Sequence, residues 1–147
     1  MQSRTKIFFI LCFLVVFLIY GRTIFGDFVF DDRGIIDHRY ILEDLSRPQK
    51  IILLPYFTEE AGAYRPIALL SYSLNFILFS GAAWSFHLVN LIFYAWTGIL
   101  IFFLVKKIFK KQLLAEAAAL LFLTVPIHAE VVANIVGRAE IFALFFS

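Results

Sequence analysis

Two clusters of polar side chains interrupt an otherwise strongly apolar chain, and the first is an acidic pair. Asp31 and Asp32 directly follow the aromatic run at 28–30 and precede Arg33. An apolar surrounding and a like-charged neighbour both favour proton uptake by a carboxylate, which is how a general base is prepared. The alternative is a solvated loop start in which an aspartate pairs locally with Arg33. The residue types alone leave both interpretations open, and they do not decide which aspartate a base would be.

The second cluster lies at 125–140. Glu130, Asn134 and Arg138 recur at every fourth position, so a continuous helix would carry them as one stripe, just after His128. Placing an arginine inside a membrane helix costs about 2.5–3.5 kcal/mol, and such stripes usually face a cavity or a binding site. An internal Glu130–Arg138 pair, or exposure to water, is the structural alternative.

A third candidate is Arg65, which Pro66 holds near a membrane interface where it could meet a lipid phosphate or simply extend toward water. Histidines 38 and 128 do not form metal-ligand spacing, and no zinc-protease motif or phosphate-binding glycine loop occurs. We therefore predict no protein-bound zinc and no cofactor; a divalent metal stays an alternative that no motif indicates.

The composition places these residues in a membrane. Of 147 residues, 62% are hydrophobic and 16% charged, well outside the range of soluble domains. The net charge of +2 and the scattered basic residues exclude a nucleic-acid partner. The single cysteine, Cys12, lies in an apolar run and allows no intrachain disulfide.

Apolar runs define the elements that must position the polar clusters. We expect an all-helical, multi-pass membrane domain in contact with lipid, with an amphipathic helix over 67–79 at the interface. The predicted spans are 7–25, 84–105, 112–127 and 139–147, and the last is truncated.

Flanking charges give the orientation. Basic residues precede the first span, and four lysines lie between 106 and 111, so the positive-inside rule puts the amino terminus and this cluster in the cytoplasm. The outer loop, 26–83, and the segment after Pro126 then share the non-cytoplasmic face. The two polar clusters are predicted to be neighbours there.

Four motifs together resemble one enzyme family. They are Gly26-Asp27-Phe28-Val29-Phe30-Asp31-Asp32, Tyr64-Arg65-Pro66, Phe86-His87-Leu88-Val89-Asn90, and Pro126-Ile127-His128-Ala129-Glu130-Val131-Val132 with Gly137-Arg138-Ala139-Glu140. In this order they resemble the amino-terminal part of the transmembrane-and-tetratricopeptide-repeat O-mannosyltransferases and their bacterial relatives, which are glycosyltransferases of the GT-C class. Val125 stands where these relatives often have a histidine.

The resemblance implies transfer of a sugar, often mannose, from a polyprenyl-phosphate carrier to a protein or glycan hydroxyl on the non-cytoplasmic face. It implies that Asp31 or Asp32 is the base and that Arg65, His128 and Arg138 hold the donor phosphate. Glu130 and Asn134 would support them. The membrane would be the bacterial inner membrane or the endoplasmic reticulum. We further expect a fragment of a longer protein, inactive by itself.

Two other functions fit the polar residues without chemistry. A non-catalytic assembly module would use them only to pair helices. A lipid carrier or transporter would use them to bind its substrate. The acidic pair discriminates among the three, because neither alternative needs a hydroxyl-activating carboxylate.

Overall fold

The computed structural model describes residues 2–44, 46, 48–56 and 64–147, and this part of the chain is helical without a strand. The α-helices are α1 (Gln2–Tyr20), α2 (Arg33–Asp37), α3 (Arg39–Leu42), α4 (Pro48–Leu53), α5 (Pro66–Phe79), α6 (Ala83–Phe109), α7 (Gln112–Thr124), α8 (Ala129–Ala133) and α9 (Arg138–Phe145). Short 3-10 turns cover Gly21–Phe25, Phe30–Asp32 and Pro126–His128. The predicted all-helical class is confirmed for these residues.

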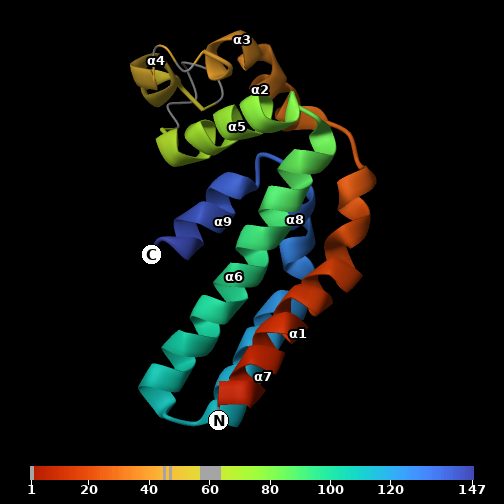
Figure 1. The fold of residues 1–147 in the computed structure, drawn as a ribbon, viewed down its shortest axis with the longest axis vertical. Helices are drawn as coiled ribbons and strands as arrows, with labels where there is room; N and C mark the ends of the chain where they lie inside the picture. Colours follow the sequence, from red (N-terminus) through yellow and green to blue (C-terminus); the bar gives the residue numbers. More distant parts are fainter. Residues whose placement is uncertain (1, 45, 47, 57–63) are drawn as a thin grey trace.

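Helices α1, α6 and α7 run side by side and form the long body of the molecule (Figure 1). Small and aliphatic side chains, among them Cys12, Val16 and Ala119, are fully buried where the helices meet. The helix of α1 with the following 3-10 turn, and α6, are each long and apolar enough to cross a membrane. The bent pair formed by α7 and the segment to Ala133 can count as a third crossing. The chain is thus an integral membrane protein.

Helix α5 lies across one end of this body, and α2, α3 and α4 cover it (Figure 1). It begins at Pro66, whose fixed φ suits a first helical position, and ends at Phe79; the next residue, Ser80, adopts a left-handed conformation with φ of 55°. The helix expected over 67–79 is therefore present. Its polar residues Ser71 and Asn75 do not form a water-facing stripe, however, because both bond to Arg138 inside the protein.

The predicted stripe on a continuous helix through 130–138 is wrong. Helix α8 ends at Ala133, residues 134–137 form a turn, and α9 starts at Arg138. Gly137 approaches the preceding turn so closely that a Cβ there would lie 2.0 Å from the Val131 oxygen. The break lets Asn134 and Arg138 point to different places, so helical spacing no longer relates them.

Basic residues from the start of α1 and from the turn after α6 gather at one end of the body. The amino terminus and the turn between α6 and α7 lie together at one end, opposite α2–α5 (Figure 1). Arg4 donates to Glu116 at 2.7 Å and ties this end of α1 to α7. Lys110 and Lys111 form the same turn. This arrangement agrees with a shared side for the basic clusters; which side is cytoplasmic stays a prediction.

Candidate functional site

The turn at 134–137 is the centre of the site, because its backbone is held by side chains from distant parts of the chain. The Val136 N–H donates to Asp32 Oδ1 at 2.9 Å. The carbonyl of Asn134 accepts from Asn90 Nδ2 at 2.9 Å. A break in a helix leaves backbone N–H and C=O groups without partners in the helix, and these groups must bond elsewhere. Here those partners are Asp32 of the acidic pair and Asn90 of α6, and they fix the conformation of the turn.

The two aspartates of the acidic pair differ in burial and in hydrogen bonding. Asp32 is fully buried, and besides Val136 its carboxylate accepts the N–H of Val29 at 3.2 Å. Asp31 is exposed to solvent. A carboxylate that is already occupied by two backbone donors is suited to hold the turn, whereas an exposed carboxylate is free to meet a substrate. The structure thus distinguishes the neighbours that sequence alone left equivalent.

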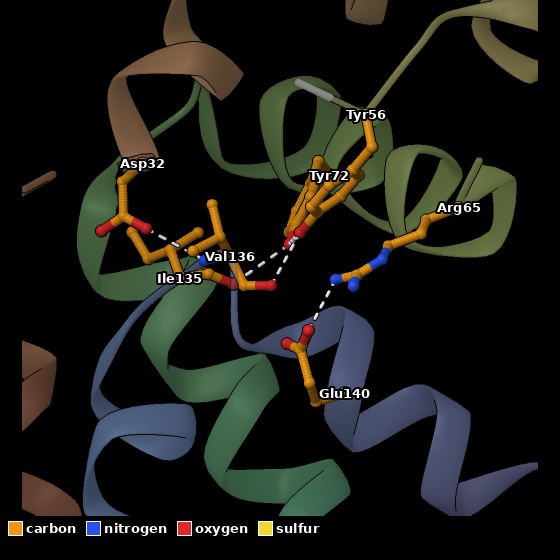
Figure 2. Close-up of polar contacts among 7 residues, drawn as sticks. All are labelled: Asp32, Tyr56, Arg65, Tyr72, Ile135, Val136 and Glu140. Atoms are coloured by element: carbon orange, nitrogen blue, oxygen red, sulfur yellow. Dashed lines mark hydrogen bonds and ion pairs between the residues drawn. The ribbon is translucent and has the colours of Figure 1, made fainter. Parts of the chain in front are cut away.

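Two tyrosines hold the turn from the opposite side. Figure 2 shows the Tyr56 and Tyr72 hydroxyls converging on the turn from the α5 side. Tyr56 donates to the Val136 oxygen at 2.7 Å and Tyr72 to the Ile135 oxygen at 3.1 Å, and the two hydroxyls lie 2.8 Å apart. Burial raises the pKa of Tyr56 to about 12, so its hydroxyl stays protonated and able to donate.

Arg138, expected to contact the donor phosphate, is fully buried. Its guanidinium donates four hydrogen bonds, to the side-chain oxygens of Asn90, Asn75 and Ser71 and to the carbonyl of Phe86, at 2.7–3.0 Å. The guanidinium carbon, Cζ, also lies over the Tyr72 ring, 4.6 Å from the ring centre. The structural alternative of a Glu130–Arg138 pair is wrong, because the partners are amides and hydroxyls of α5 and α6. In this arrangement the side chain joins three helices.

A hollow of about 220 Å³ lies against the outer side of the turn and gathers most of the other predicted residues. Its lining includes Asp31, Arg65, Glu130 and Asn134, together with Glu140. These residues come from the loop after α1, the start of α5, α8, the turn and α9. The predicted meeting of the two polar clusters is therefore realised in the fold. The hollow contains both an exposed carboxylate, which can take up a proton, and a guanidinium, which can bind an anion.

The guanidinium in this hollow is already oriented. Arg65 Nη1 lies 2.7 Å from Glu140 Oε1 (Figure 2), and both side chains remain partly exposed. The guanidinium also lies over the Tyr56 ring, 5.0 Å from its centre. An arginine presents several N–H donors in a rigid plane, so one bond to Glu140 still allows bonds to an incoming anion.

His128 lies beside this hollow rather than in it. Its Nδ1 is 2.8 Å from the Tyr94 hydroxyl and 3.0 Å from the Phe122 oxygen. The ring lines a smaller cavity of about 150 Å³, whose lining shares Val131 and Glu140 with the hollow. Its predicted phosphate contact remains a prediction, as do those of Arg65 and Arg138.

Sequence reasoning missed three contributors to the site. Glu140 belongs to a quoted motif but carried no role, and Tyr56 and Tyr72 gave no signal because aromatic residues are frequent throughout the chain. Asn75 and Asn90 on two different helices could have been read as partners for a buried arginine. Within the described ranges, no three histidine, cysteine, aspartate or glutamate side chains are arranged to hold a metal ion.

The fold and the site together define a class: a helical integral membrane protein with a polar hollow at one end of its apolar body. The chain is similar to curated protein O-mannosyl-transferases. It is 36% identical over 140 residues to the human protein O-mannosyl-transferase TMTC3, and 36% identical over 138 residues to the human protein O-mannosyl-transferase TMTC1. It is 30% identical over 139 residues to the Drosophila melanogaster protein O-mannosyl-transferase Tmtc2.

These alignments cover 86–90% of the chain but only 15% of each relative. The resemblance drawn from the four motifs is thereby confirmed. No protein-family description matches the chain, and no solved structure does.

Proposed function

We propose that the chain is part of a membrane glycosyltransferase that transfers mannose from a polyprenyl-phosphate carrier to a protein hydroxyl at the non-cytoplasmic face. In this proposal the chain supplies the general base and the group that binds the donor phosphate. The observation that carries this proposal is the hollow lined by exposed Asp31 and by Arg65. The hollow lies beside the turn at 134–137, whose backbone is held by Asp32 and Tyr56. The names of the similar proteins support mannose and a protein acceptor. The chain spans only 15% of those relatives, so the activity belongs to the complete enzyme.

The chemistry follows from the two groups. The acceptor hydroxyl attacks the anomeric carbon, and its proton passes to the Asp31 carboxylate as the new glycosidic bond forms. The bond between that carbon and the phosphate oxygen breaks, and polyprenyl phosphate leaves with the electron pair. Arg65 stabilises the charge that develops on the leaving phosphate, for which a planar guanidinium is well suited. Asp32 acts through the turn, as a positioning residue.

Asparagine at each position of the acidic pair tests the assignment. Removing a positioned base costs roughly 10²–10⁴ in rate, so Asp31→Asn should nearly abolish mannose transfer while leaving the unfolding midpoint unchanged. The N–H groups of Val136 and Val29 bond to different oxygens of Asp32. Asp32→Asn keeps only one of these oxygens, so one donor loses its acceptor and the free energy of unfolding should fall by about 1–3 kcal/mol. Its effect on transfer should follow that loss of stability.

Exposed Asp37 on α2 provides the matched control, because Asp37→Asn removes a nearby carboxylate that lies outside the hollow. It should change neither transfer nor stability. Transfer measured with the enzyme at its natural length is the readout. An Asp31→Asn variant that transfers mannose at the parent rate would remove Asp31 from the reaction and assign the base to another carboxylate. Absence of transfer by the parent enzyme would instead leave the assembly module or the lipid carrier as the function.

A further inference from the structure

The end of helix α7 leaves one backbone carbonyl without its helical partner. In a continuing helix the Phe122 oxygen would accept from the N–H of residue 126, but that residue is Pro126, which has none. Proline also disfavours a helical conformation at the residue before it, and Val125 is extended with ψ of 122°. The carbonyl therefore needs a donor from outside the helix.

Two side chains meet at this carbonyl. The Tyr94 hydroxyl on α6 donates to the Phe122 oxygen at 3.0 Å. His128 Nδ1 lies 3.0 Å from the same oxygen and 2.8 Å from the hydroxyl. The imidazole also packs against the Phe122 ring, with 4.6 Å between the ring centres. Contacts on one edge and one face thus fix the orientation of the imidazole.

The carbonyl decides which nitrogen of the imidazole carries the proton. A carbonyl oxygen can only accept, so an Nδ1 without hydrogen would set two lone pairs against each other at 3.0 Å. Nδ1 must therefore carry the hydrogen and donate, and the Tyr94 hydroxyl can accept from it while donating to the carbonyl. In the neutral imidazole the other nitrogen, Nε2, is then an acceptor.

This acceptor is available to a ligand. Nε2 has no hydrogen-bond partner among the residues that the structure describes, and it is not enclosed in the interior. His128 and Glu140 line the same cavity of about 150 Å³, and Glu140 also lines the polar hollow. The imidazole thus offers an acceptor beside the hollow that contains Asp31.

We propose that Pro126 and Tyr94 are positioning residues for His128, and that they present Nε2 as an acceptor for a hydroxyl group of a substrate. The choice of a substrate hydroxyl rests on the proposed function, whereas the tautomer does not. A phosphate oxygen is itself an acceptor, so it could bond to Nε2 only after the imidazole took up a second proton. A hydroxyl can donate to the neutral ring, and it can belong to the transferred hexose or to the protein acceptor.

Nitrogen NMR reads the tautomer directly. The sample is the enzyme at its natural length with isotope-labelled histidine, and His128→Gln identifies the signal by its disappearance. Protonated and unprotonated imidazole nitrogens resonate far apart. At neutral pH we expect a protonated Nδ1 and an unprotonated Nε2 at His128. A proton on Nε2 at this pH would overturn the proposal.

Pro126→Ala separates positioning from packing. Alanine supplies an N–H and lifts the restriction on Val125, so α7 can extend and take the Phe122 oxygen for itself. The unfolding midpoint should stay or rise, while a tautomer protonated on Nε2 appears and mannose transfer falls about fivefold, the contribution of one ordinary hydrogen bond. Pro48→Ala, at the exposed first position of α4, is the matched control and should change neither tautomer nor transfer.

Tyr94→Phe keeps the ring and removes only the hydroxyl, so it tests the positioning if Pro126→Ala lowers the unfolding midpoint. It should raise one Michaelis constant about fivefold with little change in kcat. A higher KM for the polyprenyl-phosphate sugar assigns the bound hydroxyl to the hexose, and a higher KM for the protein assigns it to the acceptor. Tyr40→Phe, at a position 74% exposed on α3, is the control.

Two variants of His128 itself complete the test. The side-chain oxygen of Gln can reach the Nε2 position, whereas Asn reaches only the Nδ1 position, so His128→Gln should retain more transfer than His128→Asn. Equal losses in these two variants, or parent-like transfer in both Pro126→Ala and Tyr94→Phe, would overturn the acceptor role. An Asp31→Asn variant that still transfers mannose would overturn only the catalytic assignment, because the tautomer is read without any transfer.

Discussion

Replacing Arg138 by methionine tests whether this residue organises the site or binds the donor. Methionine keeps much of the length of the side chain but cannot donate, so four acceptors from Asn90, Asn75, Ser71 and Phe86 lose their partner. Each buried acceptor left unsatisfied costs about 1–3 kcal/mol. The lower limit applies here, because methionine also removes a charge that is costly to bury. We therefore expect the free energy of unfolding to fall by about 4 kcal/mol.

Two further variants separate the contributions to this loss of unfolding free energy. Arg138→Lys keeps the charge but not the planar fork, so it should retain only part of the bonds and cost about 2 kcal/mol. Combining Arg138→Met with Asn75→Leu removes one of the stranded acceptors, and the two losses should be less than additive by about 1 kcal/mol. Arg39→Met is the matched control: this arginine is exposed, and its pair with Glu43 is worth no more than about 1 kcal/mol.

Denaturant titration in detergent, followed by the fluorescence of Trp84 and Trp96, measures the free energy of unfolding. Binding of a polyprenyl phosphate is measured on the same samples. An organising role predicts that binding falls in proportion to the lost stability. The reasoning would be refuted if Arg138→Met unfolded at the parent denaturant concentration while losing the donor, since the guanidinium would then act on the phosphate directly.

Other predictions test the turn, the tyrosines and the orientation. Gly137→Ala should destabilise the protein by more than about 2 kcal/mol in the same titration, since its Cβ would meet backbone oxygen at 2.0 Å, whereas Gly34→Ala meets nothing within 4 Å and should be neutral or slightly stabilising. Because the pKa of Tyr56 rises from 10.0 to about 12 on folding, the unfolded chain loses this proton first and stability should decline as pH rises above 10, less so in the Phe variant. In a cysteine-free background, a cysteine at Glu43 should react with an impermeant thiol reagent added from the non-cytoplasmic side and one at Lys110 should not. The reverse labelling would invert the proposed membrane orientation.

The amino-acid sequence by itself determined the class of protein and where its polar residues gather. Apolar runs are long enough to specify membrane helices locally, since each run carries its own backbone hydrogen bonds. The basic residues that flank these runs then predict which ends of the helices share one side of the membrane. For this reason the helices at 66–79 and 83–109 appear close to where they were predicted, and the acidic loop and the 125–140 segment meet in one hollow.

Only the tertiary structure decided what each polar residue does. Helical spacing assumes that the backbone satisfies its own hydrogen bonds, whereas the turn at 134–137 is held by Asp32 and Tyr56, 104 and 80 residues away in the chain. Such partners are invisible to a local pattern. The same long-range packing buried Arg138 among amides, left Asp31 exposed beside its buried neighbour, and placed Glu140 on Arg65. Residue types indicate that polar groups in an apolar protein must form hydrogen bonds within it, but the packing of the helices determines which partners they have.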